Sequence, residues 1–310
     1  MTPSMIDIRK LRKTYRGAAH PSVDGLTLHV SEGDLFGLLG PNGAGKTTIL
    51  SVLCGLCPYD TGEVKIGGLD VRCEMRRIRR MIGIVPQEIA LYPELTLREN
   101  LRFWGELHGL STADIDRRVS DLAQRFALSE RLDSRVGEFS KGMTLKAVIA
   151  RTLLPSPDVV FLDEPTAGLD PEAAESLLAY LRTIANGGTS LFVCTHQLHG
   201  FEGLCDRIGI LVDGRLVVEG VVEDLIADRW PDQWLDMRTD DPGRAREALA
   251  SVGISGVPEK GTVHACVGSA ERAHVAVRAV VGAGVRLDAA VPRRHTLKEL
   301  YFATIEEKAS

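Results

Sequence analysis

The chain has 310 residues, enough for one large domain with a smaller companion or for two domains of similar size. Hydrophobic residues make up 44% of the sequence and charged residues 25%, as in ordinary globular proteins, so a stable core needs neither disulfides nor a metal. The net charge of −5 argues against nucleic acid as a partner.

Six cysteines are scattered along the chain, and only Cys54 and Cys57 form a C-x-x-C pair. No second pair or thioredoxin-like setting accompanies them, so we interpret both as small core residues on a helix and its exit. The first twelve residues have no apolar stretch typical of a secretory signal. Charged residues interrupt the most apolar long stretch, residues 274–291, whereas a membrane span needs about 20 mostly apolar residues. We therefore expect a cytoplasmic protein that can dock on a membrane partner.

The first third of the chain has the pattern of an α/β domain. Alternating apolar residues predict strands at residues 5–8 and 26–30, and the continuously apolar run at residues 35–39 predicts a strand buried on both faces. A glycine-rich loop follows at once, and residues 46–56 are expected to form a helix. Another strand is predicted at residues 82–85.

A mostly helical insertion is expected over residues 90–155. Thr96-Leu97-Arg98-Glu99 is a capping box that opens a helix reaching about His108, and helical spacing continues over residues 111–128. The sheet then returns in four short apolar runs, at residues 159–162, 190–194, 208–212 and 216–218.

A small α+β domain is predicted after Trp230, so we place the domain boundary between residues 228 and 229. Its expected elements are helices at residues 243–252 and 269–281 and strands at residues 262–267 and 285–287. A second capping box, Thr296-Leu297-Lys298-Glu299, opens a closing helix. The apolar face of that helix is formed by Leu297, Leu300, Tyr301 and Ile305.

The loop after the buried strand matches the phosphate-binding pattern G-x-x-x-x-G-K-[ST]. Its residues are Gly40, Pro41, Asn42, Gly43, Ala44, Gly45, Lys46 and Thr47, and Thr48 follows. Glycines let several backbone N–H groups point at one anion, and the next helix adds its positive end. Lys46 can reach the β- and γ-phosphates, and the Thr47 hydroxyl can bind Mg²⁺. The sequence therefore predicts a nucleoside triphosphate site.

Two carboxylates, Asp163 and Glu164, follow the apolar run at residues 159–162. Asp163 is placed to hold Mg²⁺ or its water, and Glu164 can polarise the water that attacks the γ-phosphate. Phosphoryl transfer needs mainly positioning, charge neutralisation and an oriented nucleophile, so these groups suffice for ATP hydrolysis.

Five further elements, in order along residues 5–225, make the chain resemble the ATPase subunits of ABC transporters. Ser140-Lys141-Gly142-Met143 resembles the signature motif of that family, and residues 165–170 resemble its D-loop. Gln87 is similar to the glutamine of the Q-loop, His196 to the switch histidine, and Tyr15 to the aromatic residue that stacks on adenine. The resemblance implies a P-loop NTPase fold with ATP and Mg²⁺ as ligands.

The resemblance also implies a shared site. Two such domains, as a homodimer or a heterodimer, would hold each ATP between the phosphate loop of one subunit and the signature motif of the other, near Asp170 of the D-loop. Gln87 would join Thr47 and Asp163 around Mg²⁺, and His196 would contact the γ-phosphate and support Glu164. This chain has Lys141-Gly142-Met143 where two glycines and a glutamine are commoner, and a lysine at this position recurs in exporter-type members. The Thr144-Leu145 pair that follows is less usual and bears on the turnover rate rather than on binding.

The C-terminal extension, residues 229–310, is similar to the tail of stand-alone exporter ATPases of the daunorubicin-resistance type. The implied function is an ATPase, on the inner face of the cell membrane, that energises a separate transmembrane permease. The alternative is a soluble ABC ATPase that remodels a protein or cofactor-assembly complex. Leu101, Phe103 and Trp104 would either form a groove for the permease or pack in the core.

Overall fold

The computed structural model describes residues 3–87, 91–198 and 200–309. The chain forms two compact units, one of Met1–Val222 with Thr304–Ser310 and one of Glu223–Ala303. The boundary expected between residues 228 and 229 stays a prediction. The last residues of the chain belong to the first unit, whereas we expected all of residues 229–310 to form the C-terminal domain.

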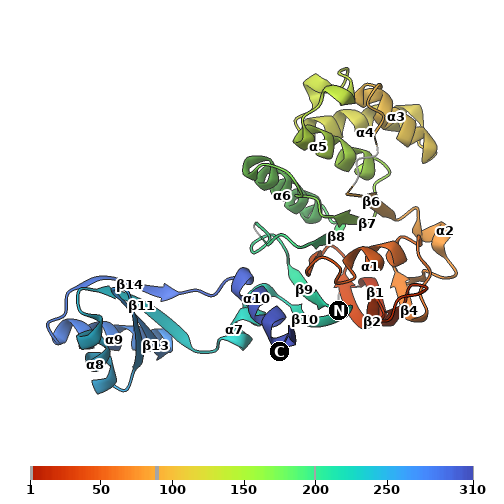
Figure 1. Cartoon of the computed structure of the whole chain (residues 1–310). Coiled ribbons are helices and arrows are strands. Elements are labelled where there is room, and N and C mark those ends of the chain that lie inside the picture. Colours follow the sequence, from red (N-terminus) through yellow and green to blue (C-terminus); the bar gives the residue numbers. More distant parts are fainter. Residues whose placement is uncertain (1–2, 88–90, 199, 310) are drawn as a thin grey trace. The chain divides into compact units, whose positions relative to one another are not determined.

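The centre of the first unit is a six-stranded sheet with strand order β10-β9-β3-β8-β7-β6 (Figure 1). All neighbouring strands run parallel except β10, which pairs antiparallel with β9. The strands are β3 (Leu35–Leu39), β6 (Ile82–Val85), β7 (Val159–Asp163), β8 (Ser190–Thr195), β9 (Arg207–Val212) and β10 (Arg215–Gly220). Every residue of β3 and β8 is buried, because helices cover a parallel sheet on both faces.

A smaller antiparallel sheet lies beside this one in the same unit, with order β2-β1-β4-β5. Its strands are β1 (Ser4–Lys13), β2 (Val23–Ser31), β4 (Thr61–Ile66) and β5 (Leu69–Asp70). Alternate residues of β2 are buried, as expected for a sheet with one face on the core. Both sheets share a hydrophobic core with α1 (Lys46–Leu53), which follows the phosphate loop.

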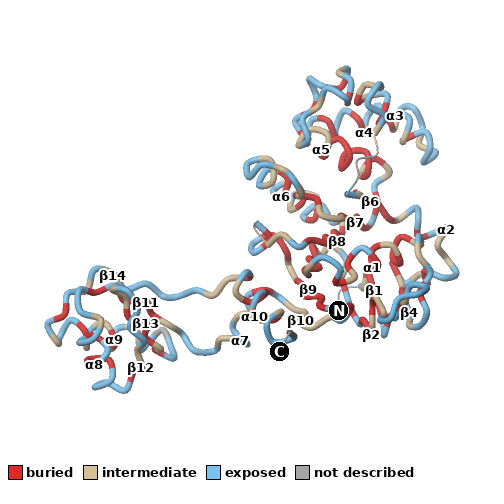
Figure 2. The backbone as a smooth tube through the Cα atoms, in the orientation of Figure 1, coloured by how far each residue is buried: buried red, intermediate tan, exposed pale blue. Residues whose placement is uncertain are grey.

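Three aromatic rings pack against one another in the middle of the parallel sheet. The rings of Phe36 and Phe192 stack with centroids 5.5 Å apart, and Phe161 meets Phe192 edge-on at 6.0 Å. These three residues come from neighbouring strands β3, β8 and β7, so the stacking fixes those strands relative to one another. Figure 2 shows that buried positions concentrate along these strands and along the inner sides of the helices.

The expected helical insertion is present. It contains α3 (Leu97–Leu107), α4 (Thr112–Arg125), the short 3₁₀ helices η1 (Ser129–Arg131) and η2 (Val136–Glu138), and α5 (Lys141–Leu153), which lie together in Figure 1. The predicted capping box is confirmed, since Thr96 and Glu99 bond reciprocally at the start of α3. Leu101 was expected as a candidate groove residue, but it is fully buried and belongs to the core.

Two more helices complete the first unit around the sheet. They are α2 (Met75–Ile78) and α6 (Pro171–Asn186). Asp170 caps α6 by accepting a hydrogen bond from the backbone N–H of Ala173, and Pro171 occupies the first helical position, where its missing N–H costs nothing.

The second unit has the element order β11-α8-β12-β13-α9-β14 and an antiparallel sheet of order β12-β13-β11-β14, which is the ferredoxin-like arrangement. Its elements are β11 (Gln233–Thr239), α8 (Pro242–Ser251), β12 (Ser255–Glu259), β13 (Thr262–Gly268), α9 (Ala270–Gly282) and β14 (Leu287–Arg293). The helices α7 (Val222–Arg229) and α10 (Leu297–Ala309) precede and follow them. The closing capping box is confirmed by reciprocal hydrogen bonds between Thr296 and Glu299.

Three strands of this unit differ from the sequence expectation. The strands β11 and β12 were not predicted, and β14 begins where the predicted strand at residues 285–287 ends. The strands β12 and β14 lie at the two edges of the sheet and are largely exposed, so they lack the alternation that marks a half-buried strand. Across the described residues, no helix has both the length and the apolar character needed to cross a bilayer.

Candidate nucleotide-binding site

The carboxyl ends of three parallel strands bring the predicted site residues together. The strands β3 and β7 flank β8, with Leu39 opposite Thr195 and Asp163 opposite Cys194. The phosphate loop, which follows β3, and the carboxylates at the end of β7 therefore lie at the same edge of the sheet, with the end of β8 between them. Ligands of α/β proteins bind at this edge of a parallel sheet.

A cavity of about 380 Å³ lies at this edge. Its lining combines loop, strand-end and switch residues, namely Ser22, Asn42, Gly43, Gly45, Lys46, Thr47, Thr48, Gln87, Asp163, Glu164 and His196. Ten of these eleven residues were predicted site residues. Ser22 was not predicted, because it precedes β2 in a segment without a motif.

Two glycines let the phosphate loop take its shape. Gly45 has a φ of 110°, and a Cβ there would collide with the backbone oxygen of Ser22. A Cβ on Gly40 would lie 2.5 Å from the backbone oxygen of Leu211. Neither position accepts a side chain without displacing backbone, so the loop can bring its N–H groups close to a ligand. Ala44 is buried beneath the loop.

Lys46 is buried with its ammonium group inside the loop. Its Nζ donates to the carbonyl oxygens of Gly40, at 2.7 Å, and Pro41, at 3.1 Å, and lies 3.8 Å from Oε1 of Glu164. A buried ammonium needs such partners, since transfer out of water is costly without them. The positive charge is therefore held where the phosphates of a nucleotide would lie.

Asp163 and Thr47 form the second polar group of the site. The Thr47 hydroxyl donates to Oδ2 of Asp163 at 3.3 Å. Burial raises the pKa of Asp163 above its ordinary value, although the hydrogen bond from Thr47 and the charge of Lys46 oppose the shift. A bound divalent cation would reverse this balance, because it favours the ionised carboxylate.

Glu164 has the left-handed φ of 48° although it is not a glycine. Its carboxylate is held by several donors. Oε2 accepts from the Thr195 hydroxyl at 2.9 Å, and Oε1 lies 2.8 Å from Nδ1 of His196 and accepts from the His196 backbone N–H at 3.0 Å. An unusual backbone conformation held by the surrounding structure is frequent at functional sites.

Tyr15 is half exposed beside the first turn of α1. Its hydroxyl lies 3.4 Å from the Thr48 hydroxyl, and the Cys57 thiol is 3.8 Å from it. The Lys13 ammonium lies 5.1 Å from the ring centroid, a cation–π arrangement. The ring is therefore anchored to the phosphate-loop helix at one end and remains accessible, as an adenine-stacking residue must be.

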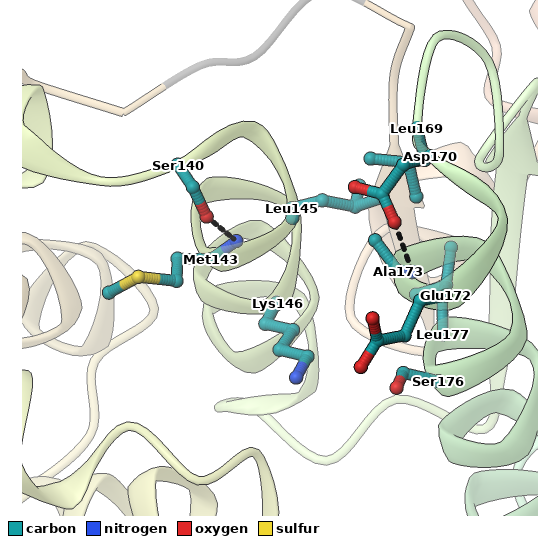
Figure 3. Close-up of a pocket in the computed structure, with 11 residues that line it drawn as sticks. Ser140, Met143, Leu145, Lys146, Leu169, Asp170, Glu172, Ala173, Ser176 and Leu177 are labelled. Atoms are coloured by element: carbon teal, nitrogen blue, oxygen red, sulfur yellow. Dashed lines mark hydrogen bonds between the residues drawn. The ribbon is translucent and has the colours of Figure 1, made fainter.

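Three of the signature residues, Ser140, Gly142 and Met143, line a different cavity, of about 260 Å³, between α5 and α6 (Figure 3). Ser140 caps α5 by accepting from the Met143 backbone N–H at 3.3 Å, and Lys141 is the first helical residue. Gly142 and Met143 belong to the first turn of the helix. Among the described residues, none lines both cavities, so within one chain the structure does not bring the signature motif to the phosphate loop.

Sequence reasoning missed two polar residues behind Glu164, namely Thr195 and Gln197, and gave no separate role to Thr166 of the D-loop. Thr166 donates to Oε1 of Gln197 at 3.0 Å, and the Gln197 backbone N–H donates to Oγ1 of Thr195 at 3.0 Å. The only available signal was position, since Thr195 and Gln197 flank His196 in the sequence.

A glycine-rich loop at the end of a parallel strand, with two carboxylates at the end of another strand of the same sheet, defines a P-loop nucleotide hydrolase. The sequence profile of the ABC transporter family matches residues 23–167. The chain belongs to the ATP-binding proteins of ABC transporters, and it is an ATP-binding, ATP-hydrolysing subunit of that family.

Similar proteins agree with this assignment. The chain is 38% identical over 250 residues to Nod factor export ATP-binding protein I of Burkholderia thailandensis, covering 81% of this chain and 82% of that protein. It is 37% identical over 220 residues to a linearmycin resistance ATP-binding protein of Bacillus subtilis, covering 71% and 70%.

Solved structures show the same fold. An ATP-binding subunit of an ABC transporter superposes with a TM-score of 0.65 at 33% identity, covering 73% of this chain and 93% of that one. An ATP-binding cassette solved as a dimer with ADP and phosphate has a TM-score of 0.63 at 26% identity, covering 70% and 99%.

Proposed function

We propose that this chain is the motor of an exporter: it pairs with a second ATPase subunit, a copy of itself or a paralogue, and drives a separate transmembrane permease. The observation that carries the proposal is the single cavity shared by Lys46, Asp163, Glu164 and His196, beside a phosphate loop. Export is supported by relatives whose names specify export or resistance. In this proposal the protein is peripheral on the inner face of the cell membrane, and residues 1–228 are the ATPase domain.

ATP would bind with its phosphates in the curve of the loop formed by residues 40–47. Lys46 would exchange the carbonyl oxygens of Gly40 and Pro41 for phosphate oxygens, and the backbone N–H groups at the start of α1 would donate to the same anion. Tyr15 would stack on the adenine ring.

Mg²⁺ fits the oxygen donors of the site. In the described part of the chain no three His, Cys, Asp or Glu side chains are grouped to hold a metal ion. Mg²⁺ does not need such a cage, since it commonly keeps several waters and uses one or two carboxylates with substrate phosphates. Thr47 and Asp163, with Gln87 from the end of β6, would supply the protein ligands. The ion would neutralise charge on the phosphates.

Hydrolysis would depend on Glu164 and His196. As the γ-phosphate attracts Lys46 and the His196 side chain, Oε1 of Glu164 would lose two of its neighbours and become available to accept a proton from the attacking water. The backbone of His196 stays bonded to Glu164, so the carboxylate keeps its direction.

The second half of the site would come from the partner subunit. The signature residues Ser140, Lys141, Gly142 and Met143 lie at the amino end of α5, where the helix dipole favours an anion. Their separation from the phosphate loop of the same chain supports a contact in trans to the partner's ATP. Asp170, at the start of α6, lines the same cavity as the signature motif.

A groove between β6 and the helical insertion is the proposed permease contact. This cavity of about 440 Å³ is lined mainly by apolar groups and includes Leu56, Ile84 and Trp104. Arg151, buried in its wall, lies with its guanidinium 4.7 Å from the Trp104 ring centroid. Phe103 is exposed but does not line the groove, so of the three residues considered from sequence only Trp104 contributes to it.

The purified protein tests the proposal through two substitutions. Lys46→Ala should lower ATP affinity roughly ten- to hundredfold, since a charge-assisted hydrogen bond to phosphate is lost. Glu164→Gln should retain ATP binding, trap an ATP-bound dimer and lose hydrolysis roughly a hundredfold or more. Lys65→Ala, in the peripheral sheet, is the matched control for Lys46→Ala. Wild-type turnover in either site variant would refute the assignment, and a polytopic membrane protein that co-purifies with the chain would support the permease.

A further inference from the structure

We propose that Thr195 is a positioning residue that aims the catalytic carboxylate of Glu164, and that Gln197 connects this support to Thr166 at the start of the D-loop. The inference rests on the proposed function of Glu164, and two of its three residues, Thr195 and Gln197, lie outside the motifs. It assigns a role to three polar side chains that line neither the phosphate loop nor the signature cavity.

Thr195 is fully buried at the last position of β8. Its hydroxyl has one proton, which it donates to Oε2 of Glu164 at 2.9 Å, and its oxygen accepts the backbone N–H of Gln197 at 3.0 Å. Both hydrogen-bonding capacities are used in a defined direction. A buried hydroxyl satisfied in this way has little freedom to rotate, so it is a fixed donor.

The two oxygens of Glu164 have different neighbours. Oε1 faces Nδ1 of His196, whose side chain is 41% exposed, and the ammonium of Lys46. Both of these groups would turn to the γ-phosphate. Oε2 has its shortest contact with Thr195, which is buried and cannot follow the nucleotide. Thr195 would therefore hold Oε2 while Oε1 accepts the proton of the attacking water.

The backbone of Glu164 makes such a support necessary. Its left-handed φ of 48° is uncommon for a residue with a side chain, and the surrounding structure must impose it. The Glu164 backbone N–H donates to the carbonyl of Cys194 at 2.8 Å, which ties the residue to the end of β8. Backbone and side chain are thus both attached to the last two residues of the same strand.

Gln197 extends the support to the D-loop. The Thr166 hydroxyl, which is buried, donates to Oε1 of Gln197 at 3.0 Å. The backbone carbonyl of Thr166 also accepts a hydrogen bond from the backbone N–H of Leu169 in the turn that leads to Asp170. A hydrogen-bonded path therefore runs from the turn that precedes α6, through Gln197 and Thr195, to Glu164. Contact between the D-loop and a partner subunit would act on the catalytic carboxylate through this path.

The first test compares Thr195→Val with Thr195→Ser. Valine keeps the shape and removes the donor, so kcat for ATP should fall roughly ten- to hundredfold while KM changes less than about twofold. Serine restores the hydroxyl, and kcat should return to within about threefold of wild type. A valine variant that keeps wild-type kcat overturns the proposal, as does a serine variant that is as slow as valine, since the latter indicates a merely structural role.

Thr195→Ala is the second variant if valine does not fold, because it removes the hydroxyl without adding an apolar branch against the carboxylate. The same kcat loss, at unchanged ATP affinity, is expected. The proposed function is judged separately by Lys46→Ala and Glu164→Gln. If the Lys46 and Glu164 variants behave as expected, and neither Thr195→Val nor Thr195→Ala loses activity, then only the positioning role of Thr195 is wrong.

A double-mutant cycle tests the path to the D-loop. Thr166→Val and Gln197→Ala each break the same hydrogen bond, and Gln197→Ala keeps the backbone N–H that Thr195 accepts. If the hydrogen bond between Thr166 and Gln197 is responsible for the loss of kcat, the double variant should lose no more kcat than the single variant with the larger loss. Additive losses would show that the two residues act independently and would overturn the connection.

Discussion

The hydroxyl of Thr47 lies 3.3 Å from the carboxylate of Asp163, although 116 positions separate the two residues in the chain. The first follows β3 and the second ends β7, and both strands flank β8 in the same direction. The pair joins the phosphate loop to the catalytic strand. It also holds a carboxylate where burial disfavours its charge.

Asp163→Asn should make the protein more stable near neutral pH while hydrolysis falls roughly a hundredfold, since a ligand of Mg²⁺ is lost. Burial raises the pKa of Asp163, so the folded state keeps the proton to higher pH than the unfolded chain, whose value is near 3.8. The contribution of Asp163 to stability is therefore complete below that value and is lost as the pH rises through the folded pKa. Thermal unfolding from pH 4 to pH 7 measures the difference, which should shrink on acidification.

Asp24 provides a control, because its pKa is shifted in the opposite direction. Hydrogen bonds from Arg215 hold the pKa of Asp24 below its ordinary value. Its contribution is present above the unfolded pKa and is lost as the pH falls through the folded one. Asp24→Asn should therefore destabilise the protein at neutral pH, and the difference in stability from wild type should also shrink at acidic pH. An Asp163→Asn variant that is less stable than wild type at pH 7 would contradict the assigned shift.

Mixed dimers should reveal whether the signature motif acts in trans. A Cβ at Gly142 would make only an ordinary 3.5 Å contact with Ala173, so Gly142→Asp should fold while its carboxylate repels phosphate. A Lys46→Ala subunit mixed with a Gly142→Asp subunit would form one intact composite site. A subunit with both changes, mixed with wild type, would form none.

Hydrolysis is therefore expected in heterodimers isolated from the first mixture and not in heterodimers isolated from the second, after wild-type homodimers have been removed. A site complete within one chain gives the reverse result, because the second mixture then contains an unaltered subunit. Gly203→Asp is the matched control, since a Cβ there meets nothing within 4 Å. Dimer formation in each mixture is checked by tagging one subunit and capturing the other.

The proposed permease groove predicts different effects for two exposed leucines. Leu56 is 72% exposed and lines the groove, whereas Leu107 is 64% exposed and does not. Leu56→Asp should weaken capture of the permease roughly tenfold or more, because a charge is placed in an apolar contact, and Leu107→Asp should not. Equal effects of the two substitutions would remove the groove from the interface. Thermal unfolding of both variants checks the fold.

The cysteines should react according to burial. Burial raises the pKa of Cys54 to about 12, and that of Cys205 to about 12 as well, whereas Cys73 is exposed. Only the thiolate is nucleophilic, so iodoacetamide at pH 8 should modify Cys73 well before Cys54. Mass spectrometry of the folded and the urea-unfolded protein measures this order. Rapid modification of Cys54 would favour a reactive C-x-x-C pair over the core interpretation.

The sequence by itself determined the parts of the site that act through neighbouring residues. The phosphate loop of residues 40–47 and the strand end at Asp163 and Glu164 are local patterns, because a tight turn, a helix start and a buried strand each require particular residue types in order. The same holds for the capping boxes at Thr96 and Thr296, whose reciprocal bonds span only three residues.

Only the tertiary structure decided which of these parts meet. Sheet order places β8 between β3 and β7, and this brings Thr195 against Glu164 and Thr47 against Asp163. It also buries Leu101, which the helical pattern left open between groove and core. Contacts of this kind depend on strand order and on the packing of distant segments, and local residue patterns do not encode either of them.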